Sequence, residues 1–167
     1  SQKTAATKLA MDGFEDAVFD MFKEEWQRQR ADSMPRCLAI VDDSPETQFM
    51  FPEFQLAQQL LQARGIDTLI LDPSELEYIG ALTAKGKRVD MVYNRLVDFA
   101  LDAPAHEAVR HAYLDGAVVV TPNPRAHALM ADKRNLILLS DPPTLRSWGL
   151  SEEEAGYLES AVPKTRL

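Results

Sequence analysis

Glycine and cysteine are scarce in this sequence, and each shortage argues against a class of site. Glycine accounts for 7 of 167 residues, and no glycine-rich turn follows any predicted strand. The dinucleotide fingerprint and the phosphate-binding P-loop both need such turns, so we expect neither a nicotinamide-nucleotide enzyme nor a stand-alone nucleotide hydrolase. One cysteine allows no intrachain disulfide and no cysteine-based zinc site. This residue, Cys37, precedes the apolar run 38–41, where a small buried side chain is the expected state.

Long apolar runs and an excess of positive charge are also missing. No stretch reaches the roughly 18 apolar residues that a membrane span needs, and no secretory signal is recognisable, so we expect no membrane partner and a cytoplasmic location. The formal net charge of -8 argues against a general nucleic-acid binder, which needs a basic face to neutralise phosphates. The three histidines, His106, His111 and His127, have no spacing that suggests a metal site.

What the sequence does contain is an alternation of short apolar runs and helical periodicities, which predicts a layered α/β domain with a mostly parallel sheet. We predict strands at 38–41, 68–71, 89–93 and 117–120, helices at 51–63, 104–113, 124–131 and from Ser151 on, a helix or strand at 136–139, and a hairpin tip at 84–87. Residues 1–34 predict a long N-terminal helix with an apolar stripe suited to docking: Thr7, Met11, Phe14, Val18, Met21 and Phe22. Trp26 is expected to pack in the core.

Polar residues follow the predicted strands, where the carboxyl ends of a parallel sheet would gather them at one edge. They are Asp42, Asp43, Asp72, Asn94, Arg95 and the segment 121–123. Ligands of open α/β sheets bind at this edge. The guanidinium of Arg95 offers a planar set of donors suited to a carboxylate or a phosphate. The alternative is a salt bridge from Arg95 to Asp98 or Asp102.

The acidic pair Asp42–Asp43 allows two interpretations. Adjacent carboxylates at a strand end suit Mg²⁺, and the pair resembles that of response-regulator receiver domains, which would make the chain a signalling or interaction module. A receiver needs a phosphorylatable aspartate at the end of the third strand, where this chain has Asn94 and Arg95. The other interpretation is a turn in which one aspartate caps the backbone and the other is solvated.

The order of three segments carries a family resemblance. They are Val-Asp-Met-Val-Tyr-Asn-Arg at 89–95, Gly-Ala-Val-Val-Val-Thr-Pro-Asn-Pro at 116–124 and Ala-Asp-Lys-Arg-Asn at 131–135. This order resembles the end of the pre-ATP-grasp domain of ATP-grasp ligases similar to glutathione synthetase. It is most similar to the circularly permuted, glutathionylspermidine synthase-like proteins. The resemblance covers 89–167 well and the first half by architecture alone.

The resemblance implies a Rossmann-like, substrate-side domain of an ATP-dependent carboxylate-amine or carboxylate-thiol ligase. It implies that Asn94, Arg95 and Asn123 bind a small carboxylate substrate and that Lys133 contacts ATP. The machinery that holds ATP and Mg²⁺ belongs to later domains of the family. The resemblance therefore implies no catalytic and no metal-binding residue in this chain.

The same resemblance implies a division of the chain. Residues 1–34 would form the docking helix, 35–162 the pre-ATP-grasp domain, and 163–167 the start of an ATP-grasp domain that follows. We therefore expect a fragment that is inactive alone and whose partners are the missing domains of the same protein. A receiver-like module, or a purely structural domain in which Arg95 is salt-bridged, remains the alternative.

Overall fold

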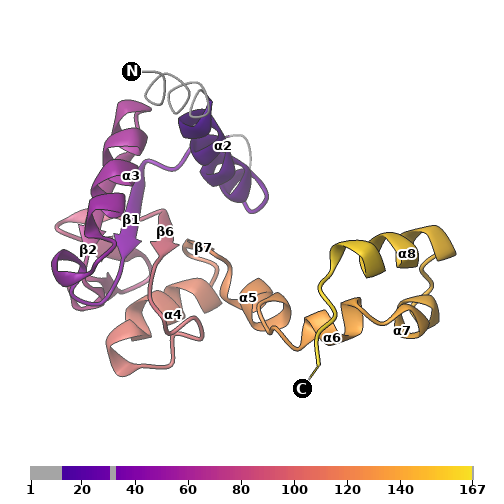
Figure 1. Cartoon of the computed structure of the whole chain (residues 1–167). Coiled ribbons are helices and arrows are strands. Elements are labelled where there is room, and N and C mark those ends of the chain that lie inside the picture. Colours follow the sequence, from indigo (N-terminus) through magenta and orange to yellow (C-terminus); the bar gives the residue numbers. More distant parts are fainter. Residues whose placement is uncertain (1–12, 31–32, 167) are drawn as a thin grey trace. The chain divides into compact units, whose positions relative to one another are not determined.

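The computed structural model describes residues 13–30 and 33–166, and the chain forms two compact units, Ser1–Pro124 and Arg125–Leu167. The first unit contains both sheets, and Figure 1 labels the four strands of the larger one. The expected apolar residues Thr7 and Met11 lie outside the described residues. No helix in the described ranges is long and apolar enough to cross a membrane.

A four-stranded parallel sheet forms the centre of the first unit. Its strands are β1 (Cys37–Val41), β2 (Asp67–Leu71), β6 (Met91–Asn94) and β7 (Val119–Thr121), and they lie in the order β2-β1-β6-β7. Every residue of β1 is buried, as expected for a short continuous apolar run in the middle of a parallel sheet. The predicted α/β architecture with a mostly parallel sheet is therefore confirmed.

Helices cover one face of this sheet. α2 (Phe14–Gln27) and α3 (Phe51–Ala63) pack against the side chains of Leu38 and Ile40 through a shared apolar cluster. Phe22 and Trp26 of α2 are buried in that cluster, so Trp26 packs in the core as predicted. Two other residues of the predicted stripe, Phe14 and Met21, are exposed.

The opposite face is covered by a helix and a small antiparallel sheet. α4 (Glu107–Leu114) shares a second apolar cluster with alternate residues of β1, β6 and β7. The small sheet has the order β3 (Glu77–Tyr78), β4 (Leu82–Ala84) and β5 (Lys87–Arg88). Lys85 and Gly86 connect β4 to β5 with φ of 51° and 74°, which is the two-residue hairpin turn that the sequence predicts.

Three short 3-10 helices shape the loops of the first unit, each beginning with proline. They are η1 (Pro45–Thr47), η2 (Pro73–Glu75) and η3 (Pro104–His106). η1 and η2 directly follow the ends of β1 and β2, and η3 leads into α4. Proline fixes φ near the helical value, which suits the first position of such turns.

The second unit is helical. It contains α6 (Asn135–Leu139), α7 (Pro142–Ser147) and α8 (Glu152–Ala161), while α5 (Pro124–Met130) begins at the boundary between the units. The segment 136–139, for which the sequence allowed helix or strand, is helical. Ser151 caps α8 as predicted, because its side chain accepts the backbone N–H of Glu154, whose carboxylate returns the contact.

Candidate functional site

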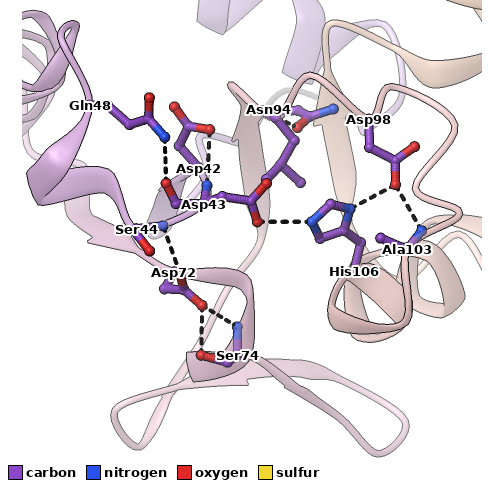
Figure 2. A network of polar contacts seen from close by, with 11 residues as sticks. Asp42, Asp43, Ser44, Gln48, Asp72, Ser74, Asn94, Asp98, Ala103 and His106 are labelled. Atoms are coloured by element: carbon purple, nitrogen blue, oxygen red, sulfur yellow. Dashed lines mark hydrogen bonds and ion pairs between the residues drawn. The ribbon is translucent and has the colours of Figure 1, made fainter.

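The candidate site lies at the carboxyl ends of β1 and β6, where the strand order changes direction. From β1 the chain continues to β2 on one side, and it later returns with β6 on the other side. Ligands of open α/β sheets bind outside such a switch point. Asp42 and Asp43 follow β1 here, and Asn94 and Arg95 end and follow β6. Figure 2 shows the polar network around this edge.

The alternation of side chains along a strand divides these residues between the two faces of the sheet. Arg95 lies on the α3 face, with its guanidinium carbon 5.6 Å from the Phe54 ring centroid and 5.4 Å from that of Tyr93. Asn94 and Asp43 belong to the opposite face, which α4 covers. The structure thus places Asn94 and Arg95 at one strand end with their side chains diverging.

Asn94 is 2% exposed, and only one of its two polar side-chain atoms has a hydrogen-bond partner among the described residues. Its Oδ1 accepts the backbone N–H of Leu96 at 3.1 Å, which fixes the turn after β6. Its Nδ2 is buried and has no hydrogen-bond partner among the described residues. A buried donor without a partner is costly, because water no longer solvates it.

Arg95 is partly buried, and its contacts are with Tyr93 and Glu53 and not with Asp98 or Asp102. Its Nη1 donates to the Tyr93 hydroxyl at 3.1 Å, and its Nη2 lies 3.7 Å from Oε1 of Glu53. Asp98 and Asp102 contact other side chains: Asp98 bonds to His106, and Asp102 lies 3.7 Å from Arg110. The Nε of Arg95 is buried without a partner in the described part of the chain.

Asp42 and Asp43 form a turn, and their carboxylates have different environments. The Oδ1 of the buried Asp42 accepts the backbone N–H of Asp43 at 2.9 Å, and burial raises the pKa of Asp42. The Asp43 side chain is 60% exposed. Within residues 13–30 and 33–166, no group of three or more His, Cys, Asp or Glu side chains could hold a metal ion. The geometry is that of a capped turn.

Asp72, at the end of β2, anchors the neighbouring loop. Its Oδ2 accepts the backbone N–H of Ser44 at 2.8 Å, and its Oδ1 accepts the N–H and hydroxyl of Ser74. Hydrogen bonds from Ser74 and from the Ser44 backbone lower the pKa of Asp72. The loop after β1 is thus tied to the loop after β2 (Figure 2).

His106 is part of the edge, and no local sequence pattern indicates it. Its side chain is 3% exposed, with Nε2 3.1 Å from Oδ1 of Asp43 and Nδ1 2.8 Å from Oδ2 of Asp98. The same Asp98 oxygen accepts the backbone N–H of Ala103 at 2.9 Å. Burial lowers the pKa of His106, but the hydrogen bonds to Asp43 and Asp98 outweigh it, so that the pKa is raised overall.

The remaining sequence-predicted residues have separate environments. Asn123 follows the cis Thr121–Pro122 peptide bond in the first unit, and its Oδ1 accepts the Tyr113 hydroxyl of α4 at 3.0 Å. Lys133 is an exposed residue of the second unit. Its neighbour Asp132 pairs with Arg134, whose hydrogen bonds lower the pKa of that carboxyl.

Two of the clefts in the described part of the chain adjoin the parallel sheet. One of about 590 Å³ lies beside the outer strand β2 and is lined by Ser44, Phe51, Gln58 and Asp72 among others. The other, of about 620 Å³, lies at the amino ends of the strands and is lined by Trp26, Arg36, Cys37 and Asp90 among others. The first cleft borders the polar edge, and the second lies at the opposite end of the sheet.

No protein-family model matches this chain, and a search of curated proteins likewise returns no match. Its function is therefore inferred from the chemistry of the edge and from the sequence resemblance.

Proposed function

We propose that this chain is the Rossmann-like, substrate-side domain of a larger ATP-grasp ligase that joins a carboxylate to an amine or a thiol. The observation that carries the proposal is a pair of buried donors without partners, Asn94 Nδ2 and Arg95 Nε, at the end of β6 beside the switch point. A carboxylate supplies the acceptors that these donors lack.

The two donors suggest how a substrate lies. Because Asn94 and Arg95 diverge from one strand end, a ligand that meets both must reach across the end of β6. The Glu53 carboxylate, 3.7 Å from Arg95 and 43% exposed, then holds the guanidinium until a substrate carboxylate replaces it. An ion pair of this length at a partly exposed site contributes at most about 1 kcal/mol, so that exchange is energetically easy.

The roles of the other residues follow from the family resemblance. Asn123 lines the same substrate side, Lys133 contacts the nucleotide, and the residues that hold ATP and Mg²⁺ belong to domains outside this sequence. The chain alone then neither hydrolyses ATP nor forms an amide bond. A reducing compartment such as the cytoplasm suits its single buried thiol.

The receiver-like alternative has less support. The position of its phosphoacceptor, at the end of β6, is occupied by the buried amide of Asn94. In addition, one oxygen of Asp43 is bonded to His106 and is not free for Mg²⁺ on that side.

The test uses the full-length protein and a panel of carboxylates and amines, with ATP-dependent phosphate release as the signal. Arg95→Ala is expected to raise the KM for the carboxylate at least about tenfold, the effect of one lost charge-assisted hydrogen bond, and to leave the KM for ATP unchanged. Arg95→Lys, which keeps the charge and loses the planar donor set, should recover only part of that affinity.

Arg110→Ala is the matched control, because Arg110 is an exposed arginine of the same unit with a comparable 3.7 Å ion pair. Equal kinetics for Arg95→Ala, Arg110→Ala and the wild type would remove Arg95 from the substrate site. Tight binding of MgATP to residues 1–167 alone, measured by calorimetry, would show that the nucleotide site has been assigned to the wrong domain.

A further inference from the structure

His106 connects two loops that are distant in sequence and adjacent at the ligand edge. Asp43 belongs to the loop after β1, Asp98 to the loop after β6, and the buried imidazole lies between their carboxylates (Figure 2). The Asp43 contact spans 63 residues and the Asp98 contact 8 residues.

The hydrogen-bond roles in this arrangement determine the charge of the ring. An ionised carboxylate can only accept, so each ring nitrogen must donate a proton. A neutral imidazole has one N–H, and its other nitrogen would then place a lone pair 3.1 Å from Asp43 Oδ1 or 2.8 Å from Asp98 Oδ2. Only the imidazolium satisfies both contacts.

We propose that His106 is a positioning residue, an imidazolium clamp that ties the loop after β1 to the loop after β6 and opens when the ring loses its proton. The clamp fixes the Asp43 carboxylate and the segment 97–103 beside Asn94 and Arg95. It goes beyond the proposed ligase function, because it depends on the geometry of the edge and not on the identity of a ligand.

The charged groups around the ring are consistent with this role. Asp43 and Asp98 contact it directly, and the charge of His106 also reaches Asp72, which precedes η2. η2 packs against η3, and its own acid, Glu75, pairs with Lys85 at 3.1 Å. The acids that face the ring therefore all favour its charged form.

The direct test is the protonation state of His106 in the wild-type chain. Long-range proton–nitrogen correlation spectra report whether both ring nitrogens carry protons. We expect the imidazolium pattern for His106 at neutral pH, and a titration midpoint above the value of about 6.5 of an unperturbed histidine. A neutral single tautomer of His106 at neutral pH would overturn the proposal, with no variant needed.

Hydrogen exchange tests whether His106 holds the two loops in place. At a fixed pH near 6, His106→Gln should lower the protection of amides in 43–48 and 97–103 by about tenfold, because a glutamine cannot donate to two acceptors on opposite sides. Strands β1 and β6 should keep their protection.

His111→Gln is the matched control and should change neither loop. Asp98→Asn serves as the second variant: it keeps the shape of the side chain, weakens the clamp from the other side, and should lower the titration midpoint of His106. Unchanged protection of both loops in His106→Gln, or an unchanged midpoint in Asp98→Asn, would overturn the clamp and leave the carboxylate site untouched.

Discussion

The carboxylate of Asp72, which follows β2, accepts the backbone N–H of Ser44, in the loop after β1, at a distance of 2.8 Å. Ser44 has a left-handed backbone with φ of 45°, a conformation that a serine adopts at some cost. The bond from Asp72 offsets that cost and holds the loop that carries Asp42 and Asp43. The polar edge is thus built from the turns after neighbouring strands.

Asp72→Ala should destabilise the first unit by about 1–2 kcal/mol, because it removes the acceptor of two backbone N–H groups and one hydroxyl. Urea denaturation monitored by tryptophan fluorescence measures the change. Asp102→Ala is the control, since the Asp102 side chain is 71% exposed and should change the free energy of unfolding by less than about 0.5 kcal/mol. Equal effects of the two variants would contradict the anchoring role of Asp72.

Stability should fall on both sides of a mildly acidic optimum. The pKa of Asp72 and of Asp98 is lowered in the fold, by hydrogen bonds from Ser74 and Ala103 first, so their contribution is present above about pH 3.9 and is lost as the pH falls through the folded values. The pKa of His106 is raised, so its contribution is complete below about pH 6.5 and is lost as the pH rises through the folded value.

Measuring the free energy of unfolding from acidic to alkaline pH separates the contribution of the aspartates from that of His106. His106→Gln should flatten the alkaline side and keep most of the acid side, because the hydrogen bonds from Ala103 and Ser74 remain, whereas Asp72→Asn should weaken the acid side alone. A wild-type profile that stays flat from mildly acidic to alkaline pH would exclude the His106 contribution.

Cys37 should react slowly in the native protein. Burial, with smaller effects of Asp67 and Asp90, raises the pKa of its thiol to about 11. At pH 8 the thiolate fraction is then about a hundredfold lower than for a free cysteine. Ellman's reagent should label the native chain at least about a hundredfold more slowly than the urea-unfolded chain, and similar rates would show that the side chain is accessible.

Two leucines of α3 provide a matched comparison of packing. Leu61 is fully buried, and Leu56 is 66% exposed. Leu61→Ala should cost about 2–5 kcal/mol through lost burial and a residual cavity, whereas Leu56→Ala should cost less than about 0.5 kcal/mol. Because both changes are leucine to alanine in one helix, helix propensity cancels, and comparable losses would contradict the way in which α3 faces the sheet.

Asn94→Asp probes the environment of the unpartnered amide. The new carboxylate would be 2% exposed with no cation in direct contact among the described residues, so we expect a loss of about 2–4 kcal/mol at neutral pH that shrinks as the pH falls and the group is protonated. Asn123→Asp is the control, since the Tyr113 hydroxyl can still donate to a carboxylate. A stable Asn94→Asp variant at neutral pH would show that the surroundings of residue 94 stabilise a carboxylate side chain.

Much of the fold could be predicted because its signals are local. The helix 51–63, the parallel strands, the hairpin at Lys85–Gly86 and the cap at Ser151 each depend on periodicity or on a few neighbouring residues. The two-residue strand β3 and the short helix α7 were not predicted, since neither has a long enough apolar pattern. Strand ends differ from those predicted by one or two residues, because backbone pairing and not side-chain type sets them.

The site was only partly predictable for a related reason. Strand ends indicated Asp42, Asp43, Asp72, Asn94 and Arg95, since the carboxyl ends of parallel strands meet at one edge. No sequence spacing predicts the bond between Asp43 and His106, because their two loops meet only after β1 and β6 have paired. The divergence of Asn94 and Arg95 was not predicted, although it is a consequence of strand alternation. The pairing of Arg95 with Glu53 depends on the position of α3.

The pairing of β1 with β6 also has a kinetic consequence. β1 finds its second neighbour only after the chain has passed through α3, β2 and the antiparallel sheet, and the contacts that accompany the pairing, such as Arg36 N–H to Asp90 at 2.9 Å, are equally non-local. Closing such long loops slows folding relative to a chain with local contacts. A nascent chain that ends before residue 106 can form β1 and β2 but not the Asp43–His106 bond. The Asp43–His106 contact of the polar edge therefore requires that β1, β6 and η3 are all in place, so that its presence marks the native topology of the first unit.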